Sequence, residues 1–122
     1  PLHIYPVEGT NGIAFDTVSN VGTGKTSLST VTETRIFSAS KTVFRSVELS
    51  VQATEGTNYH FTKIHLIHDG TNVYLTEYGT VFNNSPVATF NSDINNNFLR
   101  LLATSASSNQ TDYHMHIVGI RV

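Results

Sequence analysis

Apolar and polar residues alternate along the second half of the chain. Between Val47 and Ala53 every second residue is apolar, and the residues between them are polar. A period of two is typical of a strand with one buried face and one wet face. Segments 59–68 and 73–78 are also strand-like. The Asp69-Gly70 pair between them predicts a hairpin, because both residues tolerate positive φ.

Shorter apolar runs continue the pattern towards the C-terminus. We expect strands at 87–90, 98–103 and 114–122, with a turn at the three asparagines 95–97. Turn signals recur about every 8–12 residues, as in sandwiches and barrels, and no segment has sustained helical periodicity. The pattern predicts an all-β protein: an antiparallel β-sandwich of seven to nine strands, with jelly-roll-like or related connections.

The first third of the chain is less regular. Residues 1–41 are rich in glycine, serine and threonine and have only short apolar stretches. We interpret them as an extended N-terminal arm with two or three short strands. The expected organisation is therefore an arm, 1–41, and a β-sandwich core, 42–122.

Composition narrows the function classes. The chain has 122 residues, which is enough for one domain, and a net charge of −2 with 13% charged residues. This charge argues against a nucleic-acid partner, which requires a basic surface. No apolar run reaches the ~20 residues of a membrane helix, so no membrane partner is expected. Cysteine is absent, which excludes disulfides and thiol chemistry.

Two motifs suggest a bound cofactor or metal. Gly22-Thr23-Gly24-Lys25-Thr26 resembles the end of a phosphate-binding loop, but Ser19 occupies the position of its first glycine. We favour a flexible loop here. His114 and His116 would share one face of a strand, but two imidazoles are too few for a closed metal site. We favour a polar strand end or a subunit contact, and expect neither cofactor nor metal.

Candidate catalytic groups are scattered. Glu48 and Glu77 lie in expected strands and could face each other, as a glycosidase requires. The more ordinary interpretation is two solvated strand positions. No G-x-S-x-G motif is present. The sequence therefore predicts a protein that is not an enzyme.

Tyrosines are the other notable group. A sugar-stacking platform could be built by Tyr59, Tyr74, Tyr78 and Tyr113. The alternative is that these rings pack across strands, which is the commoner role of aromatic residues in sheets.

Segment 61–78 contains His-Asp-Gly-Thr followed by Tyr-Leu-Thr-Glu-Tyr, and two further strand-like segments follow it at 88–94 and 99–107. In this order and spacing, the three segments resemble successive strands of a β-sandwich module of structural proteins from tailed phages, especially marine and cyanobacterial ones. The resemblance covers about residues 43–122. It implies a place in the virion, in a tail fibre, collar or capsid decoration protein, and it implies no catalytic residues.

The resemblance leads to two functional hypotheses. The first is a capsid decoration (cement) protein, or a tail or collar accessory protein, that binds the assembled particle through its arm and sheet edges. Its partners would be other virion proteins, and a homo-oligomer is expected. The arm contacts would be Ile4, Tyr5, Ile13 and Phe15. The second is a receptor- or glycan-binding module of a phage tail fibre, which would bind a host surface glycan.

Overall fold

The structure is a computed structural model that describes residues 11–122, with side chains from residue 13 onward. Ile4 and Tyr5 therefore lie outside the described residues. The described part contains no helix that could cross a membrane. Its regular elements are strands: β1 (Asn11–Phe15), β2 (Ser19–Leu28), β3 (Thr34–Ser40), β4 (Phe44–Glu55), β5 (Asn58–His68), β6 (Val73–Phe82), β7 (Ala88–Asn95), β8 (Phe98–Ser105) and β9 (Thr111–Arg121).

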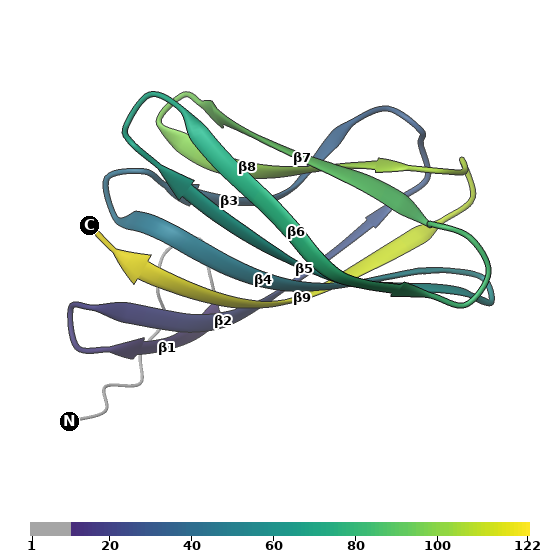
Figure 1. The fold of residues 1–122 in the computed structure, drawn as a ribbon, viewed down its shortest axis with the longest axis horizontal. Helices are drawn as coiled ribbons and strands as arrows, with labels where there is room; N and C mark the ends of the chain where they lie inside the picture. The colour runs from purple at the N-terminus through teal and green to yellow at the C-terminus, as the bar shows by residue number, and fades with distance from the viewer. Residues whose placement is uncertain (1–10) are drawn as a thin grey trace.

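The strands form two antiparallel sheets that pack face to face (Figure 1). The larger sheet has six strands in the order β1-β2-β9-β4-β5-β6, and the smaller has three in the order β3-β8-β7. Hairpins join neighbours within a sheet, and the other connections cross between the sheets. The predicted all-β antiparallel sandwich is confirmed, with nine strands.

Two hairpin turns follow from residues that accept positive φ. Asn96 and Asn97 connect β7 to β8 at φ +53° and +69°. This is the two-residue turn whose backbone matches the twist of the flanking strands. Gly56 has φ +59° in the two-residue turn between β4 and β5. The predicted turn at 95–97 is thus confirmed.

The hairpin between β5 and β6 is longer than predicted. Its loop spans residues 69–72, because His68 pairs with Val73. The Asp69 carboxylate accepts the Thr71 and Asn72 N–H groups at 2.9 and 2.8 Å. Both hydrogen bonds lower the pKa of Asp69. The carboxylate serves as the acceptor for loop N–H groups, a role that a backbone carbonyl oxygen plays in a two-residue turn.

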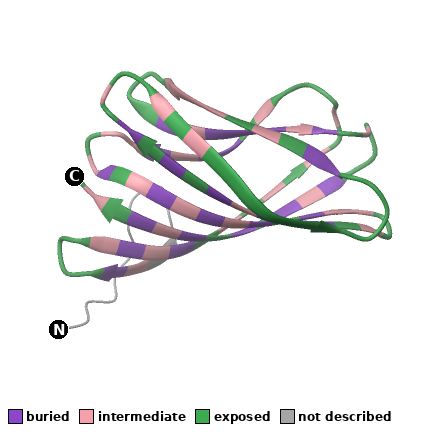
Figure 2. Cartoon of the chain, viewed as in Figure 1, coloured by how far each residue is buried: buried purple, intermediate pink, exposed green. Residues whose placement is uncertain are grey.

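The core lies between the inner faces of the two sheets. Figure 2 shows buried residues alternating with less buried ones along β4 and β9. The largest fully buried side chains come mainly from β4, β5, β8 and β9: Tyr113, Leu49, Ile64, Leu66, Leu99, Leu101 and Val51. The alternation at 47–53 therefore correctly predicted which residues of β4 face the core.

Residues 11–40 do not form an arm outside the sandwich. β2 pairs with β9 along its whole length, from Ser19 to Leu28, and β3 pairs with β8 in the smaller sheet. The glycine- and threonine-rich composition of β2 hid this strand. The threonines of β2 favour a strand. At Gly24 a Cβ would lie 3.1 Å from the Met115 methyl group, so this position leaves little room for a side chain.

Candidate functional site

The outer face of the six-stranded sheet is the side turned away from the smaller sheet. Cross-strand pairing aligns its outward side chains into rows that run across the strands. Two adjacent rows, here called the polar rows, run across β2, β9, β4, β5 and β6. The first contains Thr23, His116, Ser50, Lys63 and Tyr78, and the second contains Lys25, His114, Gln52, Phe61 and Val81.

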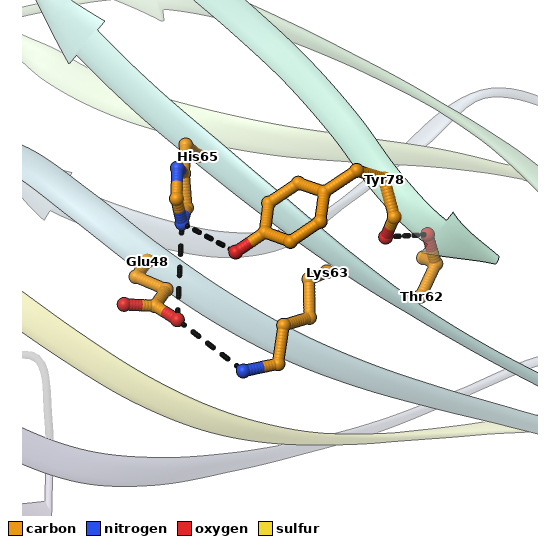
Figure 3. Close-up of polar contacts among 5 residues, drawn as sticks. All are labelled: Glu48, Thr62, Lys63, His65 and Tyr78. Atoms are coloured by element: carbon orange, nitrogen blue, oxygen red, sulfur yellow. Dashed lines mark hydrogen bonds and ion pairs between the residues drawn. The ribbon is translucent and has the colours of Figure 1, made fainter.

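A cluster of polar contacts fixes Tyr78 at one end of the first polar row (Figure 3). Its hydroxyl lies 3.0 Å from Nε2 of His65, and the two rings meet edge to face at 5.0 Å between centroids. Glu48 Oε1 lies 3.8 Å from the same nitrogen and 3.5 Å from Lys63 Nζ. On the other side, the Thr62 hydroxyl oxygen lies 3.4 Å from the Tyr78 carbonyl oxygen.

These contacts hold an exposed aromatic ring in one orientation. The tyrosine is amphipathic, with an apolar ring and a hydroxyl that forms hydrogen bonds. Around it, Glu48 supplies acceptor oxygens and Lys63 supplies donors. A fixed ring surrounded by charged and polar groups suits a ligand that has both apolar faces and many hydroxyl groups.

Two hollows open on the outer face along the second polar row, and none of the cluster residues Glu48, Lys63, His65 and Tyr78 lines either of them. One, of about 690 Å³, is lined by Lys25, Gln52, Phe61, His114 and His116, among others. The second, of about 390 Å³, shares Gln52 and Phe61 with the first and extends to Tyr59. Because they share walls, the hollows form one broad depression across β2, β9, β4, β5 and the end of β6.

One carboxylate, that of Asp112, lies beyond the polar rows. The Ser27 hydroxyl donates to it at 2.6 Å, and the Gln110 amide donates at 3.0 Å. These hydrogen bonds, together with nearby Lys25 and His114, lower its pKa. Asp112 therefore stays ionised and faces positive or neutral neighbours.

The structure separates the four predicted tyrosines. Tyr59, Tyr74 and Tyr78 are about half exposed and lie on the outer face. Tyr113 is 0% exposed, and its hydroxyl bonds to Ser105 at 2.7 Å. Its position on β9 points inward, so a sugar cannot reach it, and burial raises its pKa.

His114 and His116 both point outward from β9, as their spacing predicted. They line the larger hollow together with Lys25. Within residues 11–122, no group of three or more His, Cys, Asp or Glu side chains is placed to bind a metal ion.

The structure does not assemble the other two candidate sites, the Glu48 and Glu77 pair and the phosphate-loop-like segment 22–26. Glu48 is on the outer face, whereas Glu77 pairs with inward-facing Ile64 and accepts a hydrogen bond from Thr62 at 2.9 Å. The two carboxylates thus lie on opposite faces of one sheet and cannot act across a cleft. The phosphate-loop-like segment 22–26 is the middle of β2, paired throughout, and is not a loop.

Ile13 and Phe15, which were predicted to contact a partner, lie on β1 at the edge of the six-stranded sheet. Phe15 is exposed and Ile13 is half-buried. Sequence reasoning did not identify the cluster of Glu48, Lys63 and His65. Their outward positions follow from the alternation in β4 and β5, but their proximity depends on the pairing register of the two strands.

Comparison with known proteins shows that the chain shares its fold with part of one solved structure. No protein-family model and no curated protein matches the chain. Among solved structures, a tailspike protein of Acinetobacter baumannii bacteriophage Fri1, described as a capsular polysaccharide depolymerase, matches 92% of this chain with 12% identity and a TM-score of 0.51. The match spans 20% of that tailspike chain.

Two further tailspikes match more weakly. That of Acinetobacter phage vB_ApiP_P1 is 20% identical over 84% of this chain and 22% of its own, with a TM-score of 0.45. That of Acinetobacter baumannii phage AM24 is 12% identical over 84% of this chain and 26% of its own, with a TM-score of 0.46. At these scores neither adds to the fold assignment.

The comparison corrects one prediction from the sequence. We expected a protein that is not an enzyme, and this prediction is wrong, because the tailspike that shares the fold is described as a capsular polysaccharide depolymerase. The chain spans about a fifth of that tailspike's length. The likeness itself, at this level of identity, is one of fold.

Proposed function

We propose that this chain is a glycan-binding β-sandwich domain of a tail-associated phage protein of the tailspike kind. In this proposal the domain is carried on the virion, and its outer face binds a polysaccharide of the host surface. The fold shared with part of a tailspike supports the phage assignment. Of the two functions expected from the sequence, this is the glycan-binding one; the comparisons give no support to capsid decoration.

The observation that carries the proposal is the fixed, exposed ring of Tyr78 at the end of the polar rows. A sugar ring can stack on its apolar face while Lys63 and Glu48 bond to the sugar hydroxyls. Four strand spacings separate Tyr78 from Thr23 at the other end of its row, which is about 19 Å. A chain of several sugars can lie along that length.

The test is binding to a panel of purified bacterial capsular polysaccharides, with the protein displayed at high density. We expect at least one polysaccharide to bind. Tyr78→Ala should weaken that binding about tenfold or more, a loss of ~1.4 kcal/mol. Tyr78→Phe keeps the ring and its edge-to-face contact with His65 but loses the hydroxyl's contact with His65 Nε2, and should weaken binding less.

Thr89→Ala is the matched control, because Thr89 is exposed on β7 in the other sheet. It should bind as the unmodified chain does. An absence of any binding polysaccharide, or equal affinity of Tyr78→Ala and the unmodified chain, would refute the proposal.

A further inference from the structure

The depression on the outer face has a basic half and an aromatic half. The larger of its two hollows, of about 690 Å³, forms the basic half and is lined by Lys25, His114 and His116. Lys25 carries a full positive charge, and each imidazole offers an N–H donor. None of the ion pairs among residues 11–122 involves Lys25, so its ammonium group is free to meet a ligand.

Acidic side chains lie outside both halves. Among the described residues, no Asp or Glu lines either hollow, although the chain has nine acidic residues and only seven lysines and arginines. The neighbouring carboxylate is that of Asp112, two residues before His114 on β9. It accepts hydrogen bonds from Ser27 and Gln110 and forms no ion pair with Lys25. The basic half therefore suits an anionic group.

The aromatic half is the smaller hollow, of about 390 Å³. Phe61 and Val81 pair across β5 and β6, and Tyr59 lies on the same face of β5, two residues before Phe61. Phe61 is 41% exposed, Tyr59 51% and Val81 66%. Apolar side chains that stay exposed around one hollow mark an interaction site. This half suits an apolar group of a ligand.

The two halves meet at Gln52 and Phe61, which line both hollows. Gln52 pairs with His114 on β9 and with Phe61 on β5, so the three side chains stand in one row. Two strand spacings, about 10 Å, separate His114 from Phe61. One ligand that lies along the row can therefore contact both halves, with the Gln52 amide, which donates and accepts, between them.

We propose that the depression binds a glycan in which a carboxylate-bearing sugar is linked to a sugar that carries a methyl group, as an acetamido or a deoxy sugar does. The inference rests on the proposed glycan-binding function and names the class of glycan. The carboxylate binds Lys25 and the imidazole N–H groups through charge-assisted hydrogen bonds. The methyl group lies on Phe61, Val81 and Tyr59, which removes apolar surface from water.

Two monosaccharide probes, sodium glucuronate and N-acetylglucosamine, separate the two halves. In amide chemical-shift mapping of the 122-residue chain at constant ionic strength, we expect glucuronate to shift Lys25, His114 and His116. N-acetylglucosamine should instead shift Phe61 and Val81. Glucose, which has neither a carboxylate nor a methyl group, is the control ligand and should give the smallest shifts.

Lys25→Gln and Tyr59→Ser are matched variants, because both side chains are exposed and each lines one hollow only. Lys25→Gln should raise the Kd for glucuronate about fivefold or more and leave that for N-acetylglucosamine unchanged. Tyr59→Ser should have the reverse effect. Equal effects of either variant on both probes would contradict the division into two halves.

Shifts from both probes at the same residues would overturn the proposal, as would glucose shifts as large as theirs or no shift in the depression at all. Failure of the proposed function has a different signature, which is the absence of any binding polysaccharide in the panel. A polysaccharide that binds in a Tyr78-dependent way, while both probes leave the depression unshifted, keeps the glycan-binding function and removes only this inference.

Discussion

Gly119 and Gly24 show how tightly the interior of the larger sheet limits side-chain size. A Cβ on Gly119 would lie 2.7 and 2.8 Å from two carbons of the Phe44 ring. That ring is buried, and the Arg121 guanidinium lies 5.8 Å from its centroid. A Cβ on Gly24 would instead meet the end of the flexible Met115 side chain at 3.1 Å.

The two glycines should therefore respond differently to the same substitution. We expect Gly119→Ala to lower the free energy of unfolding by ~1–3 kcal/mol, because the Phe44 ring cannot move aside without repacking the core. Gly24→Ala should change it by less than about 1 kcal/mol. Urea denaturation of both variants measures this, and a larger loss for Gly24→Ala would contradict it.

His60 is a buried base whose environment disfavours its charged form. Its Nδ1 accepts the Val87 N–H at 3.0 Å, and its Nε2 has no hydrogen-bond partner among the described residues. The rings of Phe82 and Phe90 lie edge-on to it, at 5.9 and 6.1 Å. Burial lowers the pKa of His60, and the charge of Glu77 only partly opposes this.

This lowered pKa predicts a loss of stability in acid. The unfolded chain takes up the proton near the ordinary histidine pKa of about 6.5, whereas the folded chain takes it up only at lower pH. The contribution of neutral His60 to the free energy of unfolding is therefore fully present above pH ~6.5. It is lost as the pH drops below that value, by up to ~1.4 kcal/mol per pH unit. Denaturation between pH 7.5 and 5 should show a shallower slope for His60→Gln, and equal slopes would contradict the prediction.

At the scale of elements, the turn between β7 and β8 rests on two asparagines with positive φ. Asn97 has φ +69°, a conformation that costs most side chains about 1–2 kcal/mol but costs glycine little. We expect Asn97→Ala to destabilise the protein by about 1 kcal/mol and Asn97→Gly to leave it nearly unchanged. Thermal unfolding of the pair measures this, and equal melting temperatures would argue against it.

The sequence predicted some elements and missed others for identifiable reasons. β4 has one buried face and one solvated face, so its alternation is visible directly in 47–53. β2 carries glycines on its inner face where Met115 and Ile117 approach, so the apolar half of its alternation is missing. The loop at 69–72 was misjudged because the Asp69 side chain replaces a backbone acceptor.

At the scale of the whole molecule, the outer face arises from strands that are distant in the sequence. His116 and Thr23 are neighbours only because β9 inserts between β2 and β4. Local patterns therefore left it open whether Tyr59, Tyr74 and Tyr78 are exposed or pack across strands, and they did not reveal the depression that Tyr59 lines. Tyr113 was misassigned for the same reason, since which face of β9 is buried depends on the smaller sheet that covers it.

The central claim is that the polar rows of the six-stranded sheet bind a polysaccharide. Amide chemical-shift mapping with an oligosaccharide cut from a binding polysaccharide tests it most directly. We expect the largest shifts at Ser50, Lys63, Tyr78 and His116, and little change at Thr89 on the opposite sheet. Shifts concentrated on β3, β7 and β8, with the polar rows unaffected, would contradict the claim.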